Sequence, residues 1–418
     1  MKFRLLVLIV VIVMAASTAF SNGLSLNSIG PKGFGMGGAF VGLANDYSSL
    51  YWNPSGLTQI QKNFIGIFAT DIAPRGSYKL SAYGIDTKSK VHHYIAPNIM
   101  GSFSFSPLND LVIGLGVYVP AGIGTEWDGN ALKVMSSNKV DEWMSKIGVI
   151  NISPAIAYRI NDNISVGLAV NIFYGMFDLK RPSGGGFQYS ESSNGLGYGV
   201  TLGALVKANE MFSFGASLRT KTNVKMSGTA KDQFMTVSPY STGAPSESDF
   251  DRDVAWPMWI GAGIAFHPFD FLVITADAQF SQWSKSENEF TAKFNNALWE
   301  AGTTTMGTKI FKLHWKDVTQ YRIGIGYTFT ENIDFRLGYY YDPAPAPDET
   351  YNILFPSITY NAITFGMGYK IDDWTFDGGI EYLMGQDRTI SAAANPKAMP
   401  GIHGMDIWSW SLGIGYGF

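Results

Sequence analysis

The sequence predicts an all-β protein, a transmembrane antiparallel β-barrel of 14 strands with an N-terminal glycine-rich hatch inside the lumen. Three observations support this fold. The chain of 418 residues is 14% aromatic but only 15% charged, against about 25% charged residues in an ordinary soluble domain. Segments of about ten residues alternate apolar side chains with small or polar ones, which is typical of membrane strands. The connections between these segments are alternately short and long, as in outer-membrane barrels.

The composition excludes several classes of protein. The net charge of −4 provides no basic surface for nucleic acid. The mean hydropathy of +0.04 is too low for a bundle of membrane helices. The chain has no cysteine, which rules out disulfide scaffolds, thiolate metal sites and cysteine nucleophiles. The 5 histidines lack the spacing of a metal site, so we expect no metal and no other cofactor.

Residues 1–21 have the organisation of a secretory signal peptide. Two basic residues precede an apolar run, residues 5–16, that is too short to span a membrane stably, and small residues follow it. Cleavage is expected after Ser21 or, alternatively, after Ala19. A membrane anchor is the competing interpretation. Because no later apolar run reaches about 18 residues, the exported chain is expected in the bacterial outer membrane as a barrel.

Along residues 61–418 the dominant pattern has a period of two. The last segment, 408–418, is the clearest example, because aromatic and aliphatic side chains alternate there with glycine and serine. This alternation lasts about ten residues, the length of a tilted membrane strand, whereas soluble strands average about five or six. The predicted strands are 62–70, 98–107, 111–119, 148–160, 163–177, 196–207, 211–221, 254–266, 271–283, 317–329, 332–341, 361–371, 373–384 and 406–418.

The connections between the predicted strands differ in length in a regular way. Tight connections such as Asn161-Asp162 and Thr330-Glu331 are rich in turn-forming residues, and we expect them at the periplasmic end. The long connections are then expected outside the cell. They are 71–97, 120–147, 178–195, 222–253, 284–316, 342–360 and 385–405.

The two faces of the predicted strands differ as a membrane barrel requires. Large apolar side chains such as Ile325 and Phe365 face outward, and polar ones such as Asn151, Asp277 and Gln320 face the lumen. A closed soluble barrel would fill its centre with apolar side chains instead. The barrel must close because lipid cannot satisfy an open sheet edge. Outward aromatic residues near the C-terminus are expected to interact with the barrel-assembly machinery: Trp410, Tyr416 and Phe418.

Residues 22–60 do not fit the strand pattern. Their glycine run superficially resembles a phosphate-binding loop, but no strand precedes it and no Lys-Ser/Thr pair follows. Glycine instead allows close packing in a confined space. We therefore expect this segment to fold back into the lumen as a hatch, with a flexible periplasmic arm as the alternative. Its motif residues are Gly33, Gly35, Gly37, Gly38, Asn53, Pro54, Ser55 and Gly56.

The stretch GFGMGGAFVGLANDYSSLYWNPSGLTQ, together with Asn22-Gly23 and the aromatic-rich final strand, resembles the FadL family. Members of this family are outer-membrane transporters of long-chain fatty acids and, in some branches, of aromatic hydrocarbons. The family has Asn-Pro-Ala where this chain has Asn53-Pro54-Ser55, a change between small residues. The resemblance covers the whole mature chain and implies the same fourteen-stranded barrel with an N-terminal hatch.

The resemblance also implies a function. Family members pass apolar ligands through the lumen, shift the hatch and release the ligand sideways into the membrane near a kinked third strand. Glycine and proline interrupt strand ladders, so we expect this irregularity at Gly114, Gly116 and Pro120. By the same resemblance, loops 178–195 and 222–253 form the outer groove that first receives ligand. Its candidate lining residues are Phe187, Tyr189, Phe234, Met235 and Tyr240.

Three arginines are candidates to bind a fatty-acid carboxylate. The strand phase places Arg219, Arg322 and Arg336 in the lumen. The same phase places acidic residues there, so ion pairs that brace the barrel are the competing interpretation of each arginine. These inward acids are Asp277, Asp334, Asp377 and Glu381.

Two other classes of function remain as alternatives. An outer-membrane barrel enzyme would need a catalytic set, and none stands out, so we expect no enzyme. A general porin would conflict with a glycine-rich plug. Long-chain fatty acids are the expected substrates, with aromatic hydrocarbons as the alternative. The expected partners are hydrophobic small molecules, outer-membrane lipid and lipopolysaccharide, and the barrel-assembly machinery.

Overall fold

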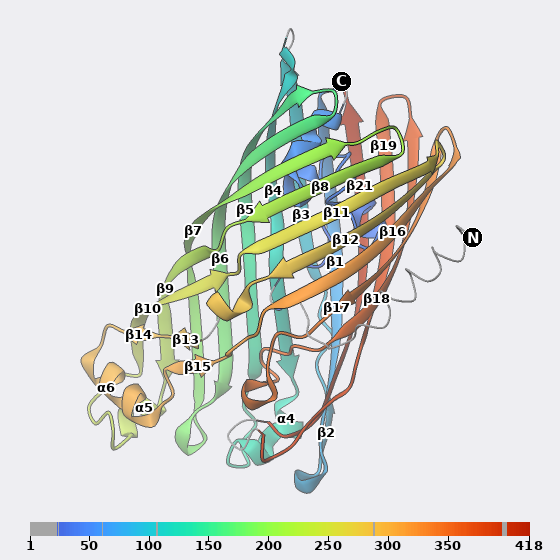
Figure 1. The fold of residues 1–418 in the computed structure, drawn as a ribbon. Helices are drawn as coiled ribbons and strands as arrows, with labels where there is room; N and C mark the ends of the chain where they lie inside the picture. Colours follow the sequence, from blue (N-terminus) through green and yellow to red (C-terminus); the bar gives the residue numbers. More distant parts are fainter. Residues whose placement is uncertain (1–22, 24, 61, 106–107, 287–288, 395–398) are drawn as a thin grey trace.

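The protein forms one closed antiparallel β-barrel (Figure 1). The computed structural model describes residues 23, 25–60, 62–105, 108–286, 289–394 and 399–418. The predicted signal peptide lies outside these described residues. The barrel closes because its first strand, β1 (Phe64–Leu80), pairs with its last, β21 (Gly401–Gly417), along 16 residues from Phe64 to Lys79. Closure gives the wall no open edge between its first and last strands, as lipid surroundings require.

Fourteen strands make the wall, which confirms the predicted fold class. Two wall strands are broken: β8 and β9 together form the seventh, and β10 and β11 form the eighth. The bounds of the other wall elements are β3 (Tyr94–Phe105), β4 (Leu108–Trp127), β5 (Trp143–Asn161), β6 (Ile164–Pro182), β7 (Gln188–Lys207), β8 (Phe212–Arg219), β9 (Thr222–Asp232), β10 (Glu247–Trp256), β11 (Trp259–Phe269), β12 (Leu272–Ser281), β16 (Val318–Thr330), β17 (Ile333–Asp342), β18 (Tyr360–Ile371) and β19 (Trp374–Gly385).

The strands are longer than predicted at the end of the barrel that carries the long connections, here called the loop end. For example, β9 and β10 pair with each other inside the predicted loop 222–253. Along this pair the apolar side chains Val224, Met226 and Phe250 are buried, while the outward positions carry lysine, serine and aspartate. The pattern is therefore inverted relative to the membrane part, and it matches a soluble barrel with an apolar centre.

The opposite end, here called the turn end, and the middle of the wall match the predicted faces. Outward side chains form an apolar band, in which Leu412 is 71% and Ile325 38% exposed. The predicted lumen residues Asn151, Asp277 and Gln320 are buried. Aromatic residues edge the band, as expected where a membrane strand meets the interface. They include Tyr158, Tyr174, Tyr198, Tyr321, Tyr327, Tyr369, Trp374 and Trp410.

The long connections fold over the loop end as an outer cap. Its large buried side chains, among them Trp283, Trp299 and Phe355, pack with the inward apolar residues of the strand extensions into one core. The cap elements are η2 (Ser81–Tyr83), β2 (Ile85–Lys88), α4 (Gly129–Leu132), η3 (Lys133–Met135), η4 (Gly184–Gly186), α5 (Phe234–Val237), η5 (Trp283–Lys285), β13 (Glu289–Thr291), β14 (Lys293–Phe294), α6 (Ala297–Met306), β15 (Ile310–Lys312), η6 (Asp348–Thr350) and β20 (Arg388–Ile390).

The N-terminal segment forms a second core inside the barrel, near the turn end (Figure 1). It folds as three short helices, α2 (Pro31–Gly35), α3 (Ser49–Trp52) and the 3-10 helix η1 (Pro54–Gln59). We call its described part, residues 25–60, the hatch. Within the described chain, all helices fall short of the length and apolarity that a bilayer crossing needs.

We expect Ile325→Arg to lower the free energy of unfolding by about 2–4 kcal/mol, because residue 325 faces the apolar band between two girdle tyrosines. Denaturant titration in lipid vesicles measures this loss. The matched control is Thr229→Arg, on the exposed outward face of β9 beyond the band, and it should cost less than about 1 kcal/mol. Equal losses would contradict the position assigned to the band.

Candidate functional site

The hatch lies against the wall at paired glycines. A Cβ at Gly366 would lie 2.9 Å from the Cα of Gly35, and one at Gly338 would lie 2.2 Å from the amide nitrogen of Gly37. Gly37 itself has a φ of 64°, which disfavours other residues. Backbone thus packs on backbone, and any larger side chain at these places would push the hatch away from the wall.

The Asn-Pro-Ser-Gly motif fastens the other end of the hatch. The side-chain amide of Asn53 donates to the carbonyl oxygens of Val41 and Ala204, both at 3.0 Å. Its Oδ1 accepts from the Ser55 hydroxyl at 2.6 Å and caps η1, with Pro54 at the first helical position. A Cβ at Gly56 would lie 2.0 Å from the carbonyl oxygen of Ala44. The motif residues therefore hold the shape and position of the hatch.

The candidate arginines of β8 and β16 bind the hatch backbone. Arg322 donates from Nη1 to the carbonyl oxygen of Gly37 at 2.7 Å. Arg219 donates from Nη2 to the carbonyl oxygen of Tyr51 at 2.8 Å, and its guanidinium lies 4.3 Å from the centre of that residue's ring. On β12, directly beside Arg322 in the strand register, Asp277 accepts the N–H groups of Phe40 and Val41, both at 2.9 Å. These charged side chains together hold the hatch to one stretch of the wall, β8 to β16.

The third arginine, Arg336, is engaged by acids near the turn end. It pairs with Asp377 at 2.5 Å and with Asp334 at 3.5 Å. These three residues, with Lys32 and Asp46 of the hatch, line a polar cavity of about 380 Å³ that lies between the hatch and the turns. Arg336 thus makes the ion pairs of the bracing interpretation, whereas Arg219 and Arg322 bind carbonyl oxygens of the hatch instead.

Between the hatch and the outer cap lies a lumen cavity of about 90 Å³. The leading part of the hatch, residues 25–28, crosses it and is here called the strap. Asn27 donates to Asp342 Oδ2 at 2.7 Å and accepts from Gln320 at 2.9 Å. Ser28 donates to Glu381 Oε1 at 3.4 Å. Among the described residues that line this cavity, Asp342 and Glu381 are acidic, and none is a lysine, arginine or histidine.

The wall is interrupted beside the strap, between β3 and β4. Their ladder ends at the pair Ile99–Val117, and β4 has a bulge between Tyr118 and Ala121. Beyond the bulge β4 still pairs with β5, but in the described chain its other edge has no β3 partner from residue 118 to 127. We call this interruption the window.

The strap takes the place of β3 at the lower part of the window. Ser25 bridges Ala121, and the Leu26 N–H donates to the carbonyl oxygen of Pro120 at 3.0 Å. Of the residues where the irregularity was expected, Pro120 thus lies in the bulge. Gly114 and Gly116 lie in the regular ladder below it. Because these glycines have no side chains, Leu50 and Leu57 of the hatch pack directly against the wall there.

The two loops expected to form an outer groove do meet at the loop end. The rings of Phe187 and Phe234 are 6.4 Å apart. Met235 is buried in the cap core, whereas Tyr240 is 58% exposed. Tyr189 is buried and donates its hydroxyl to Glu191.

A buried ion pair between Glu191 and Arg252 lies next to this groove. The pair is 2.5 Å long, and its side chains are almost completely buried. The Arg252 guanidinium also lies over the rings of Phe177 and Phe250. The sequence does not reveal this pair, because it predicts loops over 178–195 and 222–253, where no facing direction is defined. The alternation of apolar and charged residues along 247–254 was the available signal.

An acid–base pair also lies within the cap, in the connection between β12 and β16. Lys309 bonds Glu300 of α6. Burial by itself would raise the pKa of the Glu300 carboxyl, but the Lys309 ammonium and the N–H of Phe294 hold that pKa below its usual value. Within the described residues, no three His, Asp or Glu side chains are grouped as metal ligands.

A fourteen-stranded barrel with an apolar outer band and a lumen closed by its own N-terminal segment defines a class of outer-membrane protein. Residues 12–416 match the model of the family described as "Outer membrane protein transport protein (OMPP1/FadL/TodX)". The chain belongs to this family and is an outer-membrane protein. The family is one of transporters, which fits the expectation that the chain is not an enzyme.

Individual relatives share the fold at low sequence identity. The long-chain fatty acid transport protein of Escherichia coli (strain K12) is 21% identical, over 92% of each chain. The crystal structure of a Pseudomonas aeruginosa FadL homologue superposes with a TM-score of 0.77 at 15% identity, covering 95% of this chain and 100% of that one. The toluene transporter TodX of P. putida gives a TM-score of 0.75 at 17% identity, covering 94% and 99%.

We expect deletion of residues 22–60 to leave a barrel that inserts but leaks small polar solutes. The deletion removes the inner core and leaves a polar lumen that water can fill. Efflux of a small dye from liposomes measures the leak, and heat-modifiable electrophoretic mobility checks the barrel. If the truncated, folded barrel stays as tight as the full chain, the hatch does not plug the lumen.

Proposed function

We propose that this protein is a passive channel for the uptake of hydrophobic compounds, which move the hatch and leave sideways through the window into the membrane. The single observation that carries this proposal is the strap, which contacts both the lumen cavity and the free edge of β4. A ligand that occupies the cavity competes with the strap for space. Displacing the strap also removes the partner of Pro120, so arrival of ligand and opening of the window are coupled.

The order of compartments supports an inward route. The groove of Phe187 and Phe234 lies at the loop end, which we place outside the cell, and the lumen cavity lies beneath the cap. The hatch core closes the lumen toward the turn end, which we place in the periplasm. The window opens beside the cavity, above the hatch core. An apolar molecule therefore has a shorter and drier path sideways than through the hatch.

The chemistry of the cavity favours uncharged substrates. Asp342 and Glu381 line it, without a cation among the described lining residues. A fatty-acid carboxylate would have to approach these acids in a poorly hydrated space, where like charges are costly. Uncharged hydrocarbons, the substrates named for the P. putida relative, meet no such barrier. Long-chain fatty acids remain the second candidate, which the name of the E. coli relative favours.

A disulfide between Ser25→Cys and Ala121→Cys should stop uptake under oxidising conditions and restore it on reduction. The two residues are directly opposite in an antiparallel bridge, where Cα atoms are about 4.5–5.5 Å apart and can accept a disulfide. The chain has no other cysteine. Uptake of radiolabelled decane into cells lacking their own transporter measures the effect, with each single cysteine variant as control.

If the oxidised double variant takes up decane as fast as the reduced one, the strap does not gate the exit and the proposed route is wrong. The effect of the disulfide on electrophoretic mobility shows whether it has formed. This control separates a disulfide that did not form from one that formed without blocking uptake.

The acid-lined cavity predicts that decanol enters faster than decanoate of the same chain length at neutral pH. Glu381→Gln removes one of the two carboxyl groups of the lining and should narrow this difference by raising decanoate uptake. Arg322→Ala should not slow decanoate selectively, because that arginine holds the hatch backbone. A selective loss of decanoate uptake in Arg322→Ala would instead support the fatty-acid candidate and a carboxylate site at this arginine.

A further inference from the structure

The window contains a second barrier besides the strap, the side chain of Tyr94. Along this part of β3 the side chains of Tyr94 and Asn98 point inward, while Ile95 points toward lipid and is 69% exposed. Tyr94 lines the lumen cavity together with Gly122 and Gly124 of β4. A Cβ at Gly124 would lie 2.3 Å from the Tyr94 hydroxyl oxygen. The ring therefore crosses the upper window from β3 and ends against the bare backbone of β4.

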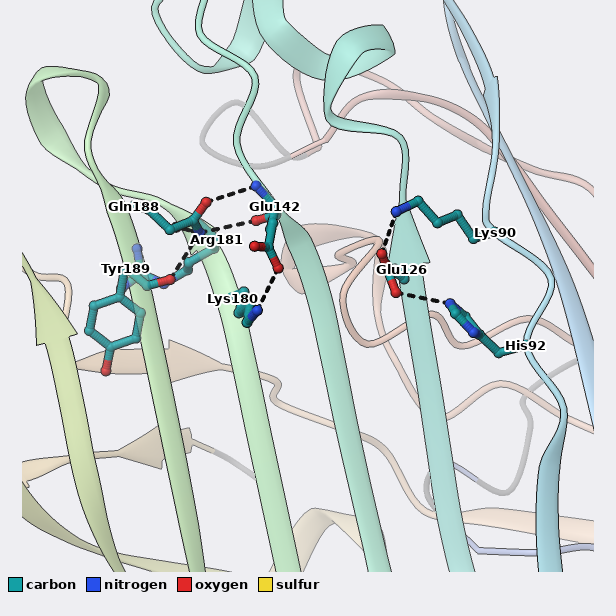
Figure 2. A network of polar contacts seen from close by, with 8 residues as sticks. All are labelled: Lys90, His92, Glu126, Glu142, Lys180, Arg181, Gln188 and Tyr189. Carbon is teal, nitrogen blue, oxygen red and sulfur yellow. Dashed lines mark hydrogen bonds and ion pairs between the residues drawn. The ribbon is translucent and has the colours of Figure 1, made fainter.

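The upper border of the window is fixed by a clasp around Glu126. The Lys90 N–H donates to the Glu126 carbonyl oxygen at 2.7 Å, and the Lys90 ammonium pairs with the carboxylate at 2.5 Å. His92 Nε2 lies 2.9 Å from the other carboxylate oxygen. Figure 2 shows Lys90 and His92 pointing toward Glu126 from the same side. The hydrogen bond to Glu126 raises the pKa of the Lys90 ammonium.

The lower border is fixed as well. The N–H of Val119, left without a β3 carbonyl, donates to Asn98 Oδ1 at 2.8 Å. Immediately below, the regular ladder begins at Ile99–Val117. Because β4 is joined to β3 at the lower border and to the segment just before β3 at the upper border, the distance between the two backbones in the window cannot change freely. Besides the strap, the Tyr94 side chain can move, because it adjoins the open space of the cavity.

An apolar hollow of about 980 Å³ lies on the lipid-facing wall, beside the lower border of the window. Pro97, Asn98, Ile99 and Val117 form the part of its lining nearest the window. Leu412 and Ile414 continue it across the neighbouring strands. The outer apolar surface thus adjoins the lower border of the window, and the inner cavity adjoins its lumen side, where Tyr94 lies.

We propose that Tyr94 is the size-selecting residue of the lateral exit, a proposal that rests on the passive channel proposed above. With the strap displaced, the free width of the window is set by the distance between the ring and the glycines of β4. Slender linear molecules pass beside the ring. Bulky polycyclic molecules pass only when the ring turns toward the cavity.

The test compares a slender and a bulky uncharged probe, radiolabelled decane and fluorescent pyrene, in cells lacking their own transporter. Tyr94→Ala should raise pyrene uptake several-fold relative to decane uptake. Tyr94→Phe keeps the ring and should behave as the native chain. Gly124→Val fills the window from the other side and should lower the pyrene-to-decane ratio. The matched control is Tyr198→Ala, at a lipid-facing tyrosine of β7 that is 66% exposed.

The outcomes separate the two proposals. If the oxidised Ser25→Cys/Ala121→Cys lock leaves decane uptake unchanged, the window is not the exit, and both proposals are overturned. If the lock blocks uptake but the pyrene-to-decane ratio is the same in the native, Tyr94→Ala and Gly124→Val chains, the exit stands and Tyr94 is not its size-selecting residue. Heat-modifiable mobility confirms that each variant is folded before uptake is compared.

Discussion

The need to satisfy every backbone hydrogen bond inside hydrocarbon governs this structure. It closes the sheet through the β1–β21 pair, and it makes any break in the wall costly. Where β4 departs from β3, other parts of the same chain therefore bind the freed backbone groups. Asn98 accepts from the N–H of Val119, and the strap donates to the carbonyl oxygen of Pro120. A break in a membrane wall thus persists only while other groups of the same chain complete its bonding.

The barrel has two environments along its length, and its side chains reverse between them. In the membrane part the outside is apolar and the inside is small or polar, which leaves room for a hatch held by arginines and glycines. Beyond the membrane the inside becomes apolar and the outside charged, which gives the cap a core of its own. The lumen cavity lies where these two interiors meet.

Much of the fold follows from the sequence because alternation with a period of two is a direct record of facing direction. The strand number and the inward position of Arg219, Arg322 and Arg336 were predictable on that basis. The loop-end extensions were not predictable, because on β9 and β10 the apolar side chains face inward and the charged ones outward, the reverse of the membrane part. The acids that pair with Arg336 were among the predicted inward residues. The hatch partners of Arg219 and Arg322 were beyond reach, since Gly37 and Tyr51 accept through carbonyl oxygens, which no residue type reveals. The sequence did not mark Tyr94, because the role proposed for it depends on the window between β3 and β4.

The contacts between glycines of the hatch and of the wall have a consequence for how such proteins diverge. Gly35 packs against Gly366, and Gly37 against Gly338, so each glycine of the hatch requires a glycine at the facing position of the wall. A change on one side alone is blocked by the backbone on the other, so the two segments are constrained to vary together. A hatch exchanged between relatives would pack only in a barrel whose wall glycines lie at the same positions along the strands. Barrel and plug are thereby inherited as one unit.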